Sequence, residues 1–296
     1  MERELFTWIR RQLRRLGQRR TDPRQVYTDA AIVAVYFWAA INDRPCVWAT
    51  VAAHWPAGLR RGPLCSQSCL SRRLRTPGVR RLIDRLEASV RRRRGALRAR
   101  SLVAMLDSKG LAVGPHSRDR HAAWGRTSGG LAKGYRLGVY RSADGALLAW
   151  RVGPMNHDER EMARRMLRDS CMAGYVVADG NFDSNALFDQ ARRAGAQLVA
   201  PRRKGPQRGL AHGYHSPARL RCRDLLENTV SRFGAELHAV RNDVERYFGH
   251  LSSTAGLLTH LPPWVRTYPR VRRWVQAKLT LAELRAILRG LRKGAA

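Results

Sequence analysis

The sequence predicts an α/β protein built on a mixed β-sheet flanked by helices. Residues 175–178 form a β-branched and aromatic run with the length of a buried strand, and residues 197–200 form a second such run. Between them, residues 185–194 carry apolar side chains at helical spacing. A strand, a helix and a strand in this order favour parallel pairing. Asp179 directly follows the first strand, at the edge where ligands of open α/β sheets bind.

The composition is strongly basic. The 296 residues include 56 Lys and Arg against 23 Asp and Glu, which gives a net charge of +33 at pH 7. This charge predicts a polyanionic partner, and arginine-rich segments with interspersed Trp and Tyr favour nucleic acid, because phosphates supply most non-specific affinity. An arginine-rich coding background is the alternative explanation, but it hardly accounts for the whole excess.

No segment is predicted to cross a membrane. The most apolar run, residues 30–41, is only about twelve residues long, and the basic N-terminus lacks the apolar core of a signal peptide. The five cysteines are odd in number and scattered, which is typical of a reducing compartment. We therefore expect a cytoplasmic, nucleoid-associated protein without a membrane partner.

Residues 1–95 are expected to form a basic helical region. Residues 1–20 are expected to form a basic amphipathic helix, and residues 79–90 carry apolar side chains at helical spacing. Residues 27–41 are apolar on most sides, which predicts a core helix. A run of four arginines at residues 91–94 then marks a junction between domains.

Residues 46–76 contain two short helical segments that suit a helix-turn-helix motif. In such a motif Ser66 and Gln67 would read bases, while Arg72 and Arg73 would bind phosphates. A plain helical packing domain is the alternative, since the Pro- and Gly-rich break between the segments is longer than this motif usually allows.

From Ser101 onward the sequence changes to strand-like runs. An Asp-Gly dipeptide at residues 144–145 predicts a hairpin turn, and a helix at residues 156–170 leads to the strand at 175–178. The strands expected before that helix are residues 102–106, 111–114, 135–140 and 146–152.

The C-terminal third is expected to be mainly helical. An insertion around residues 205–232, partly loop and partly strand, would precede a helix at residues 234–253. Residues 261–296 are predicted to be a basic helical tail, which could bind DNA, another subunit or the chain's own core.

Two aspartates follow predicted strands at corresponding positions. A crossover helix would lay residues 175–178 parallel to residues 102–106, and if these strands are neighbours, Asp107 and Asp179 emerge side by side. Oxygen ligands at that separation suit Mg²⁺ or Mn²⁺, as two-metal phosphoryl transfer requires. Either aspartate alone is more typical of an ordinary strand end or turn, and it is the two together that favour a metal site.

A third acid lies in the predicted helix at residues 234–253. Glu245 is one turn from Arg241, so the two side chains share a helix face. By itself such a pair is also typical of a surface ion pair.

The chain resembles a DDE transposase of a bacterial insertion sequence, from the insertion-sequence-four-like group with a ribonuclease H-like catalytic domain. The resemblance covers residues 101–284. It is carried by LDSKGLAVG at 106–114, KGYRLGVYRSADGALLAWRVGPMNHDE at 133–159, VADGNFDS at 177–184, GAQLVAPRRK at 195–204 and RNDVERYFGHL at 241–251.

The resemblance implies a catalytic domain at residues 101–260 in which Asp107, Asp179 and Glu245 are the catalytic acids. These acids would hold two Mg²⁺ or Mn²⁺ ions. The implied activity is cleavage of double-stranded DNA at transposon ends and transfer of the 3′-hydroxyl into target DNA, by a homodimer in the synaptic complex. Asp183 and Asp243 are lower-ranked alternatives for the acids.

Members of that group often carry the pattern Y-x2-R-x3-E-x6-K. Here Arg241 and Glu245 match, whereas His238 and Ser252 stand at the tyrosine and at the DNA-contacting lysine. Further DNA-binding residues are expected in the basic stretch that begins with Arg202, Arg203 and Lys204.

Two other functions remain open. A catalytically inactive or domesticated transposase-derived protein would bind DNA without metal. A nuclease of the same fold would cut DNA without joining strands.

Overall fold

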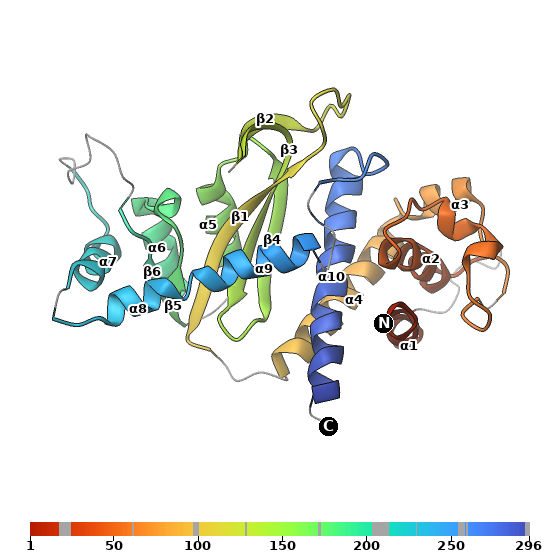
Figure 1. The fold of residues 1–296 in the computed structure, drawn as a ribbon, viewed down its shortest axis with the longest axis horizontal. Helices are drawn as coiled ribbons and strands as arrows, with labels where there is room; N and C mark the ends of the chain where they lie inside the picture. Colours follow the sequence, from red (N-terminus) through yellow and green to blue (C-terminus); the bar gives the residue numbers. More distant parts are fainter. Residues whose placement is uncertain are drawn as a thin grey trace. The chain divides into compact units, whose positions relative to one another are not determined.

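The structure, a computed structural model, describes residues 1–17, 25–60, 62–96, 101–127, 129–170, 173–202, 213–228, 230–253, 258 and 260–293. The chain divides into two compact units, whose elements are labelled in Figure 1. The first joins Met1–Leu97 to Arg272–Ala296, and the second joins Arg98–Ser253 to Leu258–Val271.

The first unit is helical, as expected. Its apolar side chains follow the helical period, with Leu5, Ile9 and Leu13 of the first helix all buried. Thr28 caps the second helix, because its hydroxyl accepts a hydrogen bond of 3.2 Å from the Ala31 backbone N–H. The helices are α1 (Glu2–Leu16), α2 (Asp29–Ile41), α3 (Gln67–Arg73), α4 (Pro77–Ala96) and α10 (Tyr268–Lys293).

Residues 48–55, which were expected to form one short helix, form two 3-10 turns instead. These are η1 (Trp48–Thr50) and η2 (Ala52–His54). The aromatic side chains of this segment explain the difference, since the Trp48 ring stacks on His54 with centroids 4.7 Å apart. A compact aromatic cluster therefore replaces the continuous helix.

From Arg272 onward, α10 belongs to the first unit rather than to a separate tail. The Lys278 ammonium donates to the Ala40 carbonyl at 2.9 Å, and the Gln276 amide donates to Asp84 and Glu87 at 2.8 and 2.7 Å. Of the three roles that the sequence left open for this segment, the structure shows packing on the chain's own core. Within the described ranges, no helix is both long and apolar enough to span a bilayer.

The second unit contains a mixed sheet with strand order β2-β3-β1-β5-β6, and β4 also pairs with β3. β1 pairs antiparallel with β3 and parallel with β5, so the predicted parallel pairing is confirmed. The predicted Asp-Gly hairpin joins β3 and β4. The strands are β1 (Val103–Ala112), β2 (Ala123–Thr127), β3 (Gly130–Ser142), β4 (Leu147–Pro154), β5 (Gly174–Val177) and β6 (Ala196–Val199).

Two features of the sheet differ from the sequence prediction. β1 is one strand rather than two, because residues 107–110 interrupt the apolar pattern but stay in continuous register with β3. Asp107 therefore lies within a strand and not at its end. β2 was not predicted, since residues 123–127 lie in a stretch with several Gly and Arg residues and no apolar run.

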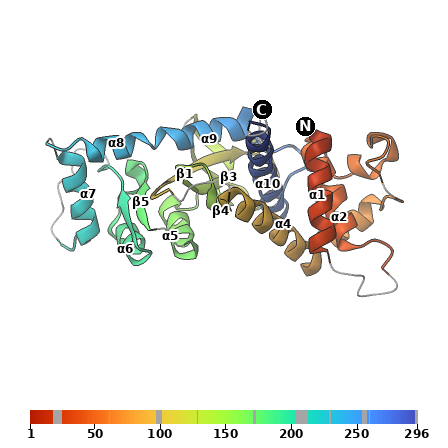
Figure 2. The ribbon, with the colours of Figure 1, turned by 90° about the horizontal axis from the view of Figure 1, so that it is seen from below.

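Helices cover both faces of this sheet (Figure 2). The helix predicted at residues 234–253 is two helices that meet at Val240 and Arg241, and the described part of the predicted insertion contains a helix instead of a strand. α5 and α6 lie on one side of the sheet, with α8 and α9 on the other. The bounds are α5 (Glu159–Asp169), α6 (Asn185–Arg193), α7 (Pro217–Glu227), α8 (Phe233–Ala239) and α9 (Asn242–Ser253).

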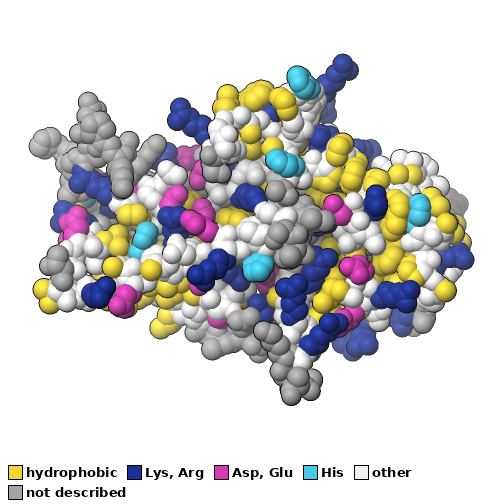
Figure 3. Space-filling model, in the orientation of Figure 1, with side chains coloured by type: hydrophobic (Ala, Val, Ile, Leu, Met, Phe, Trp, Pro, Cys, Tyr) yellow, Lys and Arg dark blue, Asp and Glu magenta, His cyan; other side chains and the backbone are white. Residues whose placement is uncertain are grey.

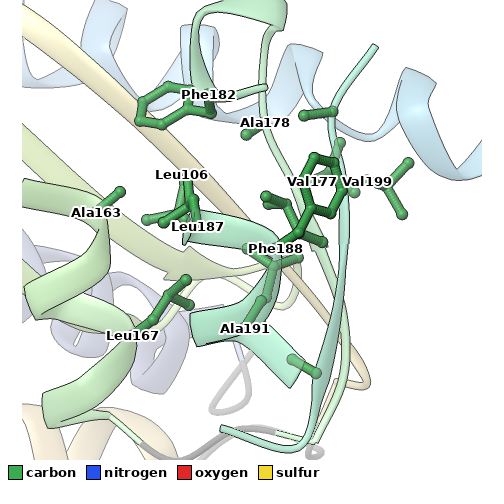
Figure 4. Packing of buried hydrophobic residues seen from close by; sticks show 14 of the residues in the cluster. Leu106, Ala163, Leu167, Val177, Ala178, Phe182, Leu187, Phe188, Ala191 and Val199 are labelled. Atoms are coloured by element: carbon green, nitrogen blue, oxygen red, sulfur yellow. The ribbon is translucent and has the colours of Figure 1, made fainter. Parts of the chain in front are cut away.

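An apolar cluster fills the space between the sheet and α5 and α6 (Figure 4). Ala104 and Leu106 of β1 belong to it, together with Phe188 of α6. Because side chains alternate along a strand, Asp107 and Lys109 project from the opposite face of β1, where α9 contacts the strand.

Candidate active site

Asp107 and Asp179 come from neighbouring parallel strands. The register pairs Val103 with Tyr175 and Met105 with Val177, and continuing it by two residues brings Asp107 beside Asp179. Strands paired in this way lie about 4.8 Å apart. The two carboxyl groups therefore lie at one place on the sheet.

Asp179 is held in place by the turn that it begins. Its carboxylate accepts a hydrogen bond of 2.8 Å from the Asn181 backbone N–H and one of 3.3 Å from the Asn181 amide, capping the 3-10 turn η3 (Gly180–Phe182). Phe182 packs into the apolar cluster behind it. The acid is thus half-buried with a fixed backbone.

Glu245 lies in the first turn of α9 and forms an ion pair with Arg241, which stands at the break between α8 and α9. The Glu245 side chain is 56% exposed. Val244, Phe248 and Leu251 are buried and anchor this helix, so its polar residues stay at the surface of the unit.

Electrostatics connect the three acids. The pKa of Asp107 is raised to about 6. Burial is the largest cause and the charges of Asp179 and Glu245 act in the same direction, while the Ser108 backbone N–H and Arg241 oppose them. The Ser108 N–H donates to the Asp107 carboxylate at 2.7 Å. Asp179, Glu245 and Arg241 therefore lie close enough to Asp107 to shift its titration.

This donor set has the chemistry of a site for a hard divalent cation. Carboxylate oxygens are the ligands that Mg²⁺ and Mn²⁺ prefer, and the charges of Asp179 and Glu245 add to the burial that raises the pKa of Asp107. The side chains do not form a closed coordination shell, since the described ranges hold no group of three or more His, Cys, Asp or Glu placed to bind a metal ion. The acids fit a cation by type and charge.

Two further polar side chains border the acids. Burial lowers the pKa of His238 and Arg241 lowers it further, while a hydrogen bond with the Ala178 backbone and the charge of Asp179 raise it. Burial also lowers the pKa of Lys109, whose ammonium donates to the Ser252 hydroxyl. The sequence reasoning did not count Lys109 as a site residue, although its spacing of two from Asp107 on a strand is a usable signal.

Residues 103–242 match the family model described as Transposase DDE domain. The matched region begins at β1 and contains Asp107 and Asp179, and it ends three residues before Glu245.

Two solved structures show similarity to the chain. The Mos1 transposase paired-end complex with left transposon end is 14% identical, over 90% of this chain and 82% of that chain, with a TM-score of 0.24. A pre-cleavage Mos1 transpososome is 12% identical, over 90% of this chain and 81% of that chain, with a TM-score of 0.22. No curated protein matches the chain.

The expected DNA-binding residues after β6 are described only in part. Arg202 is exposed, whereas Arg203 and Lys204 lie outside the described residues. Further along, Arg219 forms an ion pair of 2.7 Å with Asp183, whose side chain is only 6% exposed. Asp183 is therefore committed to a structural pair within the DDE-matched region.

The residues of the expected helix-turn-helix lie in the first unit. Ser66 caps α3, accepting a hydrogen bond from the Cys69 N–H at 3.3 Å, and Gln67 and Arg72 are exposed. Arg73 points inward instead, with one nitrogen 2.6 Å from Asp29 and another 3.0 Å from the Tyr27 carbonyl. The structure thus leaves three of the four side chains accessible to DNA.

The second unit also has a surface hollow of about 640 Å³, which Asp107, Asp179 and Glu245 do not line. It is lined by residues 113–120, with Arg118 and Arg120 exposed, and by Arg266 and Thr267. Arg266 donates to the Pro262 carbonyl at 2.6 Å and to the Val113 carbonyl at 3.1 Å. These cations make the hollow suited to an anionic ligand.

Proposed function

We propose that the chain is a DDE transposase, which cleaves DNA at the ends of a transposable element and joins the freed 3′-hydroxyl to target DNA. One observation carries this proposal: Asp107 lies in β1 and Asp179 follows the adjacent parallel strand β5, in a region that matches a transposase domain, and Glu245 is within electrostatic reach. The sequence motifs further support a ribonuclease H-like domain of an insertion-sequence-four-like bacterial element.

Asp107, Asp179 and Glu245 would hold two Mg²⁺ or Mn²⁺ ions in this proposal. When bound, such ions activate the attacking oxygen and stabilise the leaving oxygen of an in-line displacement. The chain's own residues keep the acids in place: the Asn181 and Ser108 N–H groups orient the two aspartates, and Arg241 orients Glu245.

Double-stranded DNA is the proposed substrate and partner. The net charge of +33 supplies the attraction, and Lys and Arg side chains are widespread on the face of the molecule seen in Figure 3. Ser66, Gln67 and Arg72 remain the proposed DNA-binding residues of the first unit, and Arg241 and Arg202 those of the second. Two transposon ends brought together would require at least two copies of the chain, hence a homodimer.

A DNA-binding protein without catalysis is the second candidate. Its support is that Glu245 forms an ion pair with Arg241 and that the described acids are not arranged as a closed metal shell. This candidate keeps the basic charge and the fold.

Cleavage and strand joining on DNA that carries the element's own ends decide between these functions. Wild type should cut and join in Mg²⁺ or Mn²⁺, and Asp179→Asn should do neither. Asp224→Asn is the matched control, since Asp224 is 66% exposed and pairs only with neighbouring Arg223 on the described surface. Binding without cutting by all three proteins would leave the DNA-binding candidate, and cutting without joining would indicate a nuclease.

A further inference from the structure

Lys109 shares a strand face with Asp107. The two residues are separated by two positions in β1, so their side chains project to the same side of the sheet, with Cα atoms about 7 Å apart. Both are half-buried. A positive group is therefore built into the same strand as the first candidate acid.

The Lys109 ammonium is held by a neutral partner. It donates to the Ser252 hydroxyl of α9, and that hydroxyl in turn lies 2.8 Å from the Phe248 carbonyl, to which it donates. The serine proton thus points at its own helix and the serine oxygen at the lysine. This arrangement fixes where the ammonium lies without neutralising it.

Two other cations withdrawn from solvent have acid partners. Lys278 lies 2.9 Å from Asp43, and Arg219 lies 2.7 Å from Asp183. Across the described residues no carboxylate comes within ion-pair distance of Lys109. A half-buried ammonium without a counter-charge costs free energy, so the position favours an anion supplied from outside.

We propose that Lys109 binds a backbone phosphate of the DNA strand that is cut, one or two nucleotides from the scissile phosphate. This rests on the proposed function of the three acids. The spacing supports it, since about 7 Å along β1 equals about two rises of 3.4 Å per nucleotide along the DNA helix axis. Lysine suits the task as a point charge that needs no fixed orientation of the phosphate.

Phosphate substitution tests the contact directly. Duplexes carrying the element's ends, each with one neutral methylphosphonate near the cut, are bound in EDTA so that no catalysis is needed. Wild type should lose affinity about 10- to 100-fold at one position next to the cut, as expected for one charged hydrogen bond. Lys109→Met should bind the unmodified duplex about 10- to 100-fold more weakly than wild type does, and its affinity should not change further when the methylphosphonate is introduced. Sensitivity retained in Lys109→Met overturns the proposal.

An exchange of the two partners separates a phosphate contact from a structural role. Lys109→Ser combined with Ser252→Lys places the ammonium at the other end of the same hydrogen bond, and it should recover affinity that Lys109→Ser alone loses. Lys133→Met is the control, because Lys133 is another lysine of the sheet that donates to a neutral oxygen, the Ser117 carbonyl, at 2.6 Å. No recovery in the exchanged pair, with both proteins folded by circular dichroism, contradicts the proposal.

These measurements are separable from the proposed function. The binding arm needs neither metal nor catalysis, so it reads out the Lys109 contact even if wild type does not cut. In a wild type that does cut, Lys109→Met should raise the DNA concentration for half-maximal cleavage more than it lowers the maximal rate.

Discussion

The two faces of β1 use its side chains for opposite purposes. Ala104 and Leu106 are completely buried in the cluster under α5 and α6, while Asp107 and Lys109, on alternate positions, carry charges that no described ion pair neutralises. One face of β1 therefore packs into the apolar core, and the other face carries the charged side chains of the candidate site. The difference suggests that the apolar face supplies the stability that allows the polar face to keep uncompensated groups.

Asp107→Asn should give the largest effect on the polar face. Cleavage should fall by about 10³-fold or more, because a metal-binding oxygen is lost and each 1.36 kcal/mol of barrier is a factor of ten. The melting temperature should not fall, since burial disfavours the charge that is removed.

Asp243→Asn is the control for that measurement. Asp243 lies in the first turn of α9, as Glu245 does, but it pairs with exposed Arg246 at 2.6 Å. Equal losses of cleavage in both variants would break the assignment of the site to the Asp107 face.

Leu106→Ala should lower stability and leave cleavage nearly unchanged, which is the reverse of the effect expected for Asp107→Asn. The side chain is completely buried, so its truncation should cost about 2–5 kcal/mol of unfolding free energy in a denaturant titration. Cleavage at low temperature by the remaining folded protein should be nearly unchanged.

Leu131→Ala should stay within about 0.5 kcal/mol of wild type, because Leu131 is 69% exposed. A cleavage defect in folded Leu106→Ala comparable to that of Asp107→Asn would show that the two faces are not functionally distinct.

Asp119 sharpens the comparison, because it is a fully satisfied carboxylate of the same unit. Burial raises its pKa, but hydrogen bonds from the Tyr135 hydroxyl and the Thr267 and His121 N–H groups outweigh this and hold the pKa below its usual value. Asp119→Asn should cost about 1–3 kcal/mol at pH 7.

The pH dependence of that loss has a defined sign. A lowered pKa in the folded state stabilises the fold above the unfolded value of about 3.9, and this contribution disappears as the pH falls through the folded pKa. Thermal melts should therefore show the gap between wild type and Asp119→Asn closing below about pH 4. A gap that is constant with pH would mean that the charge of Asp119 contributes nothing.

The smallest effect is expected away from both faces, at the basic hollow. Replacing Arg118 and Arg120 by glutamate should reduce the slope of log affinity against log salt by about 0.9 for each lost phosphate contact, with cleavage of saturating DNA unchanged. Arg160→Glu is the control, because Arg160 lies on α5 and pairs with Asp158 at 3.2 Å. An unchanged slope would exclude the hollow from the DNA path.

Local signals made much of the fold predictable from the sequence. The Asp-Gly turn between β3 and β4, the strand before Asp179 and the helix after it depend on neighbouring residues, and each is present in the structure. The continuity of β1 was not predictable in this way, because it depends on pairing with β3.

Contacts between distant residues explain what the sequence reasoning missed at the site. Arg73 was expected to bind phosphate, but its partner Asp29 lies 44 positions away along the chain. Lys109 and Ser252 are 143 positions apart. No local pattern encodes such pairs, so the acids could be proposed from motifs, whereas the contact between Lys109 and Ser252 could not.

The first unit is built from two segments that lie far apart in the sequence, since α10 from Arg272 onward packs with the helices of Met1–Leu97. A ribosome makes α10 after the second unit, and protein domains generally fold in the order of their synthesis. The unit proposed to cut DNA is therefore fully synthesised before the unit proposed to recognise its sequence can close its core. A translation product that stopped before Arg272 would carry the candidate active site but lack the helix that completes its N-terminal unit.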